Sequence, residues 1–342
     1  MVGQQHERPL LSEGNGMNRR FDGHLAAAMN YGLDAELAAG LSYIADLDFN
    51  DITAARVLEA EIMAMAPPVD TTGVDVRDLR IPLDNGAGTI GLRLTTPTAV
   101  ERPMPVILNL HGGGFCCGNV DAEHGRDVEL AKEVGAIVAT VAYRLAPEHP
   151  YPVALGDCYT ALCWIAENAD EIGADTDRVA VHGRSAGGGL AAALTLLTRD
   201  RGGPRICYQF LAVPELDDRL DTPSMRRFTD TPRWNRPKAI LSWKYYLADC
   251  GTPGSADIPA YAAPARETNF AGLPPTYISV MQFDPLRDEG VEYAQKLLAA
   301  DVVVELHLYP ATFHASHIIT AAEVSQRELA EEVAVLSRAL NG

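Results

Sequence analysis

One serine stands between two glycines where a short apolar run gives way to a longer one. Residues 183–187 read Gly-Arg-Ser-Ala-Gly, with apolar runs at 179–181 before them and 186–197 after them. The first run predicts a buried strand and the second a buried helix, so the chain must turn sharply at Ser185. Such a turn presents the hydroxyl at a helix N-terminus, ready for nucleophilic attack. A helix N-cap serine is the plainer alternative, but the strand–turn–helix setting favours the nucleophile.

A run of three glycines earlier in the chain predicts a second part of the same site, the backbone donors that bind an oxyanion. Residues 111–115 read His-Gly-Gly-Gly-Phe and follow directly on another apolar run. Glycines let the backbone approach a ligand closely and aim its N–H groups at one point, as acyl transfer requires for the oxyanion. We expect the amides of Gly113, Gly114 and Ala186 to be the donors, and His111 to brace the loop by hydrogen bonding. A flexible turn is the alternative.

A serine nucleophile needs a histidine to take its proton, and three histidines follow Ser185. His307 alternates with apolar neighbours on a strand-like run, so we expect it to face solvent. His314 falls in the loop after that run, at the edge of the sheet where the serine must lie. We therefore predict His314 as the base, with His317 in reserve.

The histidine in turn needs a carboxylate to orient it, and the expected chain order is serine, acid, histidine. Asp284 stands at the C-terminal tip of a strand-like run, where ligand sites of open α/β sheets form. Asp288 and Glu289 lie further on, inside a predicted helix, where pairing with Arg287 or stabilising the helix start explains them. Asp284 is the predicted orienting residue.

These residues need a scaffold that brings strand ends together. From about residue 73 onward, runs rich in Val, Ile and aromatics alternate with amphipathic runs, which predicts an α/β fold with a mostly parallel central sheet and helices on both faces. The strand-like runs lie at residues 104–110, 136–143, 178–183, 208–213, 276–281 and 302–310. The last predicted helix, 324–340, carries an apolar stripe that should face the core: Val324, Leu329, Val333, Leu336 and Leu340.

Two segments interrupt this alternation. We predict a loose polar tail over residues 1–20, helices without strands over 21–67, and a catalytic domain over 68–342 with an excursion at about 214–257. A long excursion in a compact domain is typical of a lid or binding element. Its aromatics either wall a pocket or seal the excursion onto the core, and the sequence leaves both open: Phe228, Trp234, Trp243, Tyr245 and Tyr246. Phe115, next to the glycines, is expected to border the pocket.

Composition restricts the partners. The chain has 342 residues, 47% of them hydrophobic, and a formal net charge of −18, which argues against a nucleic acid ligand because phosphates would be repelled. No run approaches the roughly 20 apolar residues that span a bilayer, and the N-terminus lacks the pattern of a secretory signal. Six cysteines show neither metal nor disulfide spacing. These features predict a cytoplasmic protein with reduced thiols.

With these residues in place, the chain resembles bacterial esterases of the hormone-sensitive-lipase-like group (family IV) in the α/β-hydrolase superfamily. The resemblance runs from about residue 105 to 314. It rests on HGGGF, VAYRLAPEHPYPVAL, the serine turn with GGGLAAALTLL after it, DPLRDEG and TFH. The runs PELDDRL, ILSWKYYL and GLPPTY are similar to the acetylesterase and heroin-esterase branch.

The resemblance implies a carboxylesterase that hydrolyses short-chain acyl esters, such as acetyl or aryl esters, without a metal or cofactor. It implies Ser185, Asp284 and His314 as the catalytic triad, and a helical cap formed by the N-terminal helices and the 214–257 segment. The expected partner is a small-molecule ester, and a homodimer is possible. An amidase or peptidase with the same triad, or a binding protein that has lost catalysis on this fold, are the alternatives.

One position departs from the group's pattern. The residue before the nucleophile is often Asp or an uncharged polar residue in such esterases, and here it is Arg184. A salt bridge that fixes the turn is the plainer interpretation, and an influence on substrate charge or pH behaviour is the alternative. The first interpretation led us to expect that Arg184→Asp keeps activity within an order of magnitude.

Overall fold

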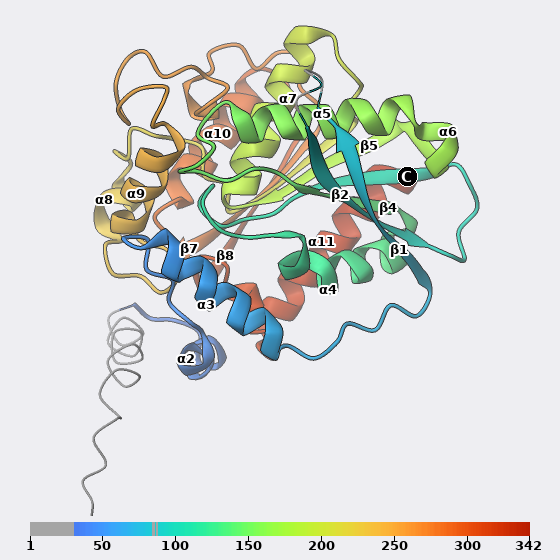
Figure 1. Ribbon diagram of the computed structural model, residues 1–342. Coiled ribbons are helices and arrows are strands. Elements are labelled where there is room, and N and C mark those ends of the chain that lie inside the picture. Colours follow the sequence, from blue (N-terminus) through green and yellow to red (C-terminus); the bar gives the residue numbers. More distant parts are fainter. Residues whose placement is uncertain (1–30, 84–85, 87) are drawn as a thin grey trace, which may run out of the picture.

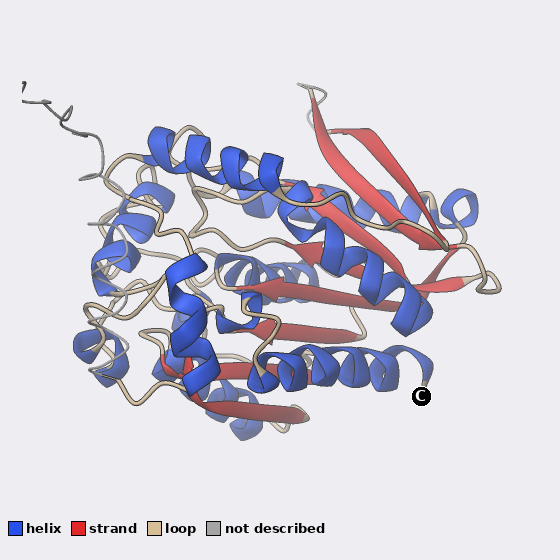
Figure 2. Ribbon diagram, turned by 90° about the horizontal axis from the view of Figure 1, so that it is seen from below, coloured by secondary structure: helices blue, strands red, loops and turns tan. Residues whose placement is uncertain are grey.

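An eight-stranded sheet runs through the molecule (Figures 1 and 2). The structure is a computed structural model and describes residues 31–83, 86 and 88–342. The spatial order of the strands is β1-β2-β4-β3-β5-β6-β7-β8. Their bounds are β1 (Val74–Pro82), β2 (Thr89–Pro97), β3 (Met104–Leu110), β4 (Ile137–Ala142), β5 (Ala174–Arg184), β6 (Tyr208–Ala212), β7 (Thr276–Phe283) and β8 (Val304–Phe313).

The sheet is mostly parallel, as the sequence predicts. Only β1 with β2 and β2 with β4 pair antiparallel, and every pair from β4 through β8 is parallel. Strand β3 is buried at every residue, because helices cover both faces of the sheet there. The β1–β2 hairpin was not assigned to strands from the sequence. Its burial is partial on β1, since that strand forms an edge of the sheet.

Helices cover both faces of the sheet (Figure 1). On one face α5, α7 and α10 contribute to the largest hydrophobic core, and on the other α4 and α11 pack on a smaller one. The bounds of the helices are α2 (Ala35–Gly40), α3 (Ile52–Met65), α4 (Val120–Leu130), α5 (Val153–Glu167), α6 (Ala169–Ile172), α7 (Ala186–Arg201), α8 (Pro223–Arg227), α9 (Arg236–Tyr246), α10 (Arg287–Ala299) and α11 (Glu323–Asn341).

The segments outside the alternating pattern contact one another. An ion pair joins Lys238 at the start of α9 to Asp46, before α3, and the Tyr245 hydroxyl donates to the Phe49 carbonyl at 3.2 Å. The N-terminal segment and the 214–257 segment are thereby tied together beside the carboxyl ends of the strands. The predicted tail, residues 1–20, lies outside the described residues, and the domain boundaries stay predictions.

Helix α11 differs from the apolar stripe that its sequence predicts. Leu336 and Leu340 are buried, but nearer the start of the helix the buried positions include the carboxylates Glu328 and Glu332. The predicted stripe is confirmed in part, because Val324 and Val333 also pack against buried clusters, but it did not include these carboxylates. The physical reason is that arginine side chains meet these carboxylates beneath the sheet, so charge pairing takes the place of apolar packing.

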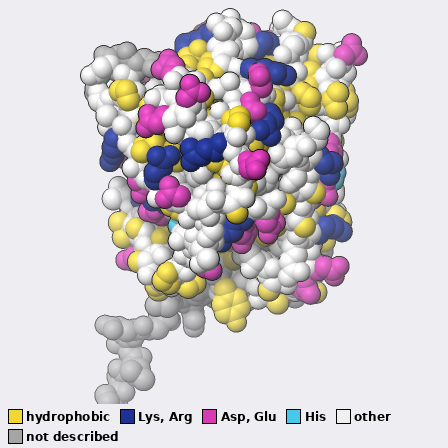
Figure 3. All heavy atoms as spheres, turned by 90° about the vertical axis from the view of Figure 1, so that its right-hand side faces the viewer, with side chains coloured by type: hydrophobic (Ala, Val, Ile, Leu, Met, Phe, Trp, Pro, Cys, Tyr) yellow, Lys and Arg dark blue, Asp and Glu magenta, His cyan; other side chains and the backbone are white. Residues whose placement is uncertain are grey.

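Two surface properties bear on possible partners. On the face shown in Figure 3, Lys and Arg side chains lie interspersed with Asp and Glu rather than gathered into one basic area. Among the described residues, no helix combines the length and the apolar character needed to cross a membrane.

Candidate active site

Ser185 occupies the turn between β5 and α7. Its φ of +56° lies in the left-handed region, which costs a non-glycine residue free energy and marks a conformation imposed by its surroundings. The flanking glycines are required by packing: a Cβ on Gly183 would lie 2.1 Å from the Gly187 carbonyl oxygen. A Cβ on Gly187 would lie 1.9 Å from the Leu110 carbonyl oxygen. The sequence pattern thus corresponds to a close backbone approach that only glycine permits.

The structure brings the three predicted side chains of Ser185, His314 and Asp284 together. His314 Nε2 lies 2.9 Å from Ser185 Oγ, and His314 Nδ1 lies 2.7 Å from Asp284 Oδ2. Donation from Nδ1–H to the carboxylate leaves Nε2 free to accept the serine proton. Asp284 is fully buried and its other oxygen accepts the Leu286 amide at 2.9 Å. This arrangement can raise the nucleophilicity of the hydroxyl.

Strand topology explains why these distant residues meet. Asp284 follows β7 directly and His314 follows β8, so both lie at the carboxyl edge of the parallel sheet, where Ser185 follows β5. His317, the reserve candidate, lies three residues on, in a short 3₁₀ turn. Its Nδ1 is 3.9 Å from Glu328, and burial holds its pKa well below the ordinary value. The contact to Ser185 belongs to His314.

The triple-glycine loop closes the site on another side. Gly113 and Gly114 have φ of +123° and +57°, and a Cβ on Gly113 would lie 2.1 Å from the Cys117 carbonyl oxygen. Among the described residues, the amides of Gly113, Gly114 and Ala186 donate no hydrogen bond. Free N–H groups beside a serine hydroxyl are what an oxyanion needs.

His111 lies inside the loop and is braced by Tyr143. The Tyr143 hydroxyl donates to the His111 carbonyl at 2.7 Å, the two rings stack 4.1 Å apart, and Nδ1 lies 2.8 Å from the Gly112 carbonyl. Burial lowers the pKa of His111 to about 4, so its imidazole is neutral at pH 7. These contacts agree with a bracing role.

A cavity of about 560 Å³ opens over Ser185. It adjoins a second cavity of about 520 Å³, with which it shares residues of the N-terminal segment, the 214–257 segment and the loop after β8. The side chains nearest the chemistry that line the first cavity are Phe49, Val213, Trp234, Ser185 and His314.

Two aromatic rings close the cavity beside the glycine loop. Phe49 and Trp234 meet edge to face at 5.1 Å, Trp234 lies 5.7 Å from the His314 ring, and a Cβ on Gly114 would touch both aromatics. The sequence left the role of Trp234 open, and Phe49 was not among the predicted site residues. A single aromatic in a segment without strands gives no local signal of the site.

The other aromatics pack into the core. Phe115 is 2% exposed and stacks on Tyr246 at 3.9 Å, with Trp243 beside it, and none of the three lines the cavity. The expectation that Phe115 borders the pocket was therefore wrong. The ring instead packs against the aromatics of α9 in the core.

Arg184 is buried in a charged cluster under the serine turn. Its guanidinium donates to Glu328 at 3.0 Å and to Glu332 at 2.5 Å, and Glu332 also pairs with Arg126 and lies 2.7 Å from His182 Nε2. Burial alone would raise the pKa of Glu332, but the charges of Arg184 and Arg126 outweigh it and hold that pKa well below its usual value. The salt-bridge interpretation of Arg184 agrees with these contacts.

The other polar residues considered from the sequence, near Arg287 and at the two adjacent cysteines, make contacts that stabilise the structure. Arg287 pairs with Asp288 at 2.8 Å, and Glu289 is buried and accepts the Leu216 amide at 2.6 Å. The adjacent thiols at positions 116 and 117 are free and buried, and burial raises the pKa of both. A thiol with a raised pKa is a poor nucleophile at pH 7.

His307 faces solvent less than predicted, with 34% of its side chain exposed. It is half-buried against Tyr277, at 5.2 Å between ring centroids, while Leu306 and Leu308 on the opposite face of the edge strand are exposed. With Glu305 and Glu331 it forms the one group of potential metal ligands found among the described residues. Arg338 already pairs with both carboxylates, which accounts for the cluster.

The family model and the relatives that match this sequence are α/β hydrolases and esterases. A family model described as the alpha/beta hydrolase fold matches residues 107–318. Esterase LipI of Mycobacterium tuberculosis is 40% identical over 265 residues, which cover 75% of this chain and 81% of the relative. Carboxylesterase NlhH of the same species is 40% identical over 266 residues, covering 75% and 81%.

Solved structures agree with these sequence matches. A bacterial heroin esterase superposes with a TM-score of 0.88 at 48% identity, over 90% of this chain and 98% of that one. Esterase LipW from Mycobacterium marinum superposes with a TM-score of 0.77 at 36% identity, over 90% and 96%.

Proposed function

The chain belongs to the hormone-sensitive-lipase-like esterases of the α/β-hydrolase superfamily and is a carboxylic ester hydrolase, and from this premise we propose that it cleaves esters of short acyl chains through an acyl-enzyme on Ser185. The observation that carries the proposal is the hydrogen-bonded line from Ser185 Oγ through His314 to Asp284, at 2.9 and 2.7 Å. Among the described residues, no other serine hydrogen-bonds to a histidine that is paired with a buried carboxylate.

In the acylation step, Ser185 Oγ attacks the ester carbonyl carbon and its proton passes to His314 Nε2. The carbonyl π pair moves onto oxygen, and the amides of Gly113, Gly114 and Ala186 hold the resulting oxyanion. Each such donor contributes about 3 kcal/mol to the transition state. The tetrahedral intermediate then collapses, the bond to the alcohol oxygen breaks, and His314 returns its proton to that oxygen.

Deacylation repeats these steps with water. His314 Nε2 takes a proton from the water, whose oxygen attacks the acyl carbon, and the oxyanion forms again beside the same amides. The bond from carbon to Ser185 Oγ breaks and His314 gives the proton back to the serine. Asp284 stabilises the imidazolium in both rounds through its contact to Nδ1.

The walls of the cavity support a preference for small acyl groups. Phe49 and Trp234 close against Gly114, so the space next to the proposed oxyanion donors is bounded by two rigid rings. Acetyl and aryl esters are the compounds we expect to react fastest, because a long acyl chain must pass these rings.

The test is Ser185→Ala measured on 4-nitrophenyl acetate, with Ser255→Ala, at a half-buried serine that lines neither cavity, as the matched control. We expect kcat/KM to fall by about 10⁴ or more for the first variant and to stay unchanged for the second. Intact-protein mass spectrometry of wild type quenched during turnover should show one added acetyl group, absent in Ser185→Ala. Retention of most of the rate in Ser185→Ala would refute the proposal.

A substrate panel separates the remaining functions. Wild type should hydrolyse 4-nitrophenyl esters with rates that fall from two to twelve acyl carbons, and 4-nitroacetanilide far more slowly. Cleavage of the anilide with flat or absent rates on every ester would favour the amidase alternative instead. The cytoplasmic location and the homodimer stay predictions.

A further inference from the structure

A guanidinium without an ion pair lies in the wall of the cavity. Arg233 lines both the cavity over Ser185 and the adjoining one, so it marks their junction. Two other arginines, Arg126 and Arg184, line the first cavity, and both are paired with Glu332. Within residues 31–83, 86 and 88–342, the Arg233 side chain has no salt bridge or hydrogen bond. Burial lowers its pKa, because desolvation outweighs the charges of the two nearest acids, Asp46 and Glu59.

The backbone holds this side chain in a strained position. Arg233 has φ of +63°, and the Trp234 amide donates to the Pro232 carbonyl at 2.7 Å, which closes a three-residue turn around it. Three-residue turns with a positive central φ are rare and costly. The turn is fixed from outside, since Lys238 Nζ donates to the Arg233 carbonyl and Thr231 Oγ1 donates to the Trp234 carbonyl, each at 2.7 Å. Strain kept in this way is typical of functional positions.

The acids near Arg233 make their hydrogen bonds to other groups, although Glu59 lines the same two cavities. The two whose charges raise its pKa are Asp46 and Glu59. Asp46 forms an ion pair with Lys238, and a Glu59 oxygen accepts the Gly118 amide at 3.0 Å. The five N–H donors of Arg233 therefore lie beside the cavity with neither acid in contact.

From these observations we propose that Arg233 recognises a free carboxylate on the ester substrate, so that the preferred substrates are esters carrying a second, ionised carboxyl group. The inference rests on the proposed esterase function and names the substrate class of that site. In a chain of net charge −18, an anionic substrate is repelled over most of the surface, and a guanidinium inside the cavity offsets that repulsion where binding occurs. Its planar fork matches a carboxylate in two parallel hydrogen bonds.

The carboxylate belongs either to the acyl or to the alcohol part, and two substrate pairs distinguish them. The acyl pair is 4-nitrophenyl hydrogen glutarate against 4-nitrophenyl valerate, which is neutral and of similar length. The alcohol pair is 4-acetoxybenzoate against 4-acetoxybenzamide. Wild type, Arg233→Gln and Lys244→Gln are compared; Lys244 is exposed on α9, so its variant makes the same charge change outside the cavity.

We expect Arg233→Gln to lower kcat/KM for the anionic member of one pair at least tenfold more than for its neutral partner, mainly through KM. Lys244→Gln should leave both ratios unchanged, and Arg233→Lys should restore part of the selectivity. Added salt should reduce the wild-type preference for the anionic ester and have no such effect on Arg233→Gln.

Two results would overturn the proposal. Equal losses on anionic and neutral esters in Arg233→Gln, with a lower melting temperature, would show that Arg233 only holds the segment in place. An unchanged anionic-to-neutral ratio in a fully stable variant would show that it binds no carboxylate. Either result leaves hydrolysis of the neutral esters as an independent measure of the esterase function itself.

Discussion

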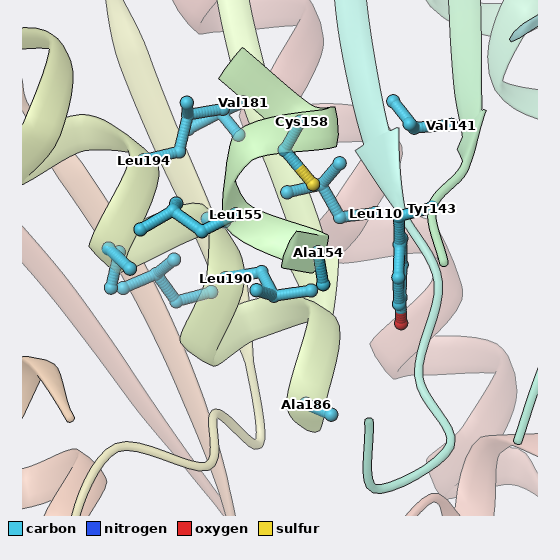
Figure 4. Close-up of a cluster of buried hydrophobic side chains, with 14 of the residues drawn as sticks. Leu110, Val141, Tyr143, Ala154, Leu155, Cys158, Val181, Ala186, Leu190 and Leu194 are labelled. Atoms are coloured by element: carbon cyan, nitrogen blue, oxygen red, sulfur yellow. The ribbon is translucent and has the colours of Figure 1, made fainter. Parts of the chain in front are cut away.

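The two faces of the sheet at β5 are packed by different chemistry. Val179 and Val181 point to the α5 and α7 side, where Figure 4 shows Leu155, Leu190 and Leu194 converging on the strands. The intervening residues Ala180, His182 and Arg184 point to the α4 and α11 side. One strand thus leads into Ser185 with an apolar layer on one face and a charged layer on the other.

The difference shows how the serine turn is fixed from two sides. On the apolar face, glycines let the start of α7 approach the end of β3 to within backbone contact. On the charged face, Arg184 is held by two carboxylates of α11, which lies far away in sequence. Apolar packing tolerates small losses of volume, whereas a buried charge left without its partner is strongly destabilising. The two faces should therefore respond differently to substitution.

The largest effect is expected on the apolar face, from Gly187→Ala. The new Cβ would lie 1.9 Å from the Leu110 carbonyl oxygen, so the backbone must shift and carry Ser185 or the glycine loop with it. Displacements of about 1 Å at a reacting group cost roughly 100-fold, so kcat/KM on 4-nitrophenyl acetate should fall by at least that factor.

Gly156→Ala in α5 is the control for Gly187→Ala. Nothing lies within 4 Å of its added Cβ, so this variant should keep full activity and gain stability of up to about 1 kcal/mol. Wild-type activity in Gly187→Ala would show that close backbone contact does not position the serine.

The next effect is expected on the charged face, from Arg184→Asp. The sequence alone favoured tolerance at this position, but the substitution would place a third carboxylate beside Glu328 and Glu332. The free energy of unfolding should drop by about 3–5 kcal/mol in urea denaturation followed by circular dichroism. Arg184→Lys keeps the charge and loses the fork, so its loss should be smaller. Equal stability of Arg184→Asp and wild type would mean that the cluster does not support the turn.

The smallest effect is expected on the pH dependence of the free energy of unfolding. It comes from Asp127, which lies on the charged face of the sheet. Its carboxyl accepts from Asn109 and Thr140, and burial, followed by the charge of Glu123, raises its pKa to about 8. The folded state therefore binds a proton that the unfolded state has released above about pH 4. Stability from this group falls as pH rises toward 8, by at most about 1.4 kcal/mol per unit.

Asp127→Asn should remove this dependence, so its urea midpoint should fall less than that of wild type between pH 5 and 8. The exposed Asp170→Asn should follow wild type across the range. If the urea midpoints of Asp127→Asn and wild type changed in parallel between pH 5 and 8, Asp127 would be ionised in the folded protein over that whole range.

Local pattern was enough for the strands β3 to β8 and for the residues of the site that follow them, but not for the β1–β2 hairpin. The run at 104–110 coincides with β3, and Ser185, Asp284 and His314 each follow a strand whose apolar residues identify it. The side on which a residue of an edge strand or a surface helix lies was harder to predict. His307 was placed on the more exposed side of its strand, and the burial of Glu328 and Glu332 on α11 was not predicted, because burial at such positions depends on what packs against them.

Strand periodicity and the backbone freedom of glycine are local properties, so the amino-acid pattern predicted the α/β architecture, the turn at Ser185 and the glycine loop. The folded arrangement was needed to show that Glu328 and Glu332 face inward to Arg184, that Phe49 meets Trp234 over the glycines, and that Arg233 lies in the cavity wall. These contacts join residues that are far apart in the chain and follow no repeat, and charge pairing and ring packing are established only once the elements have come together.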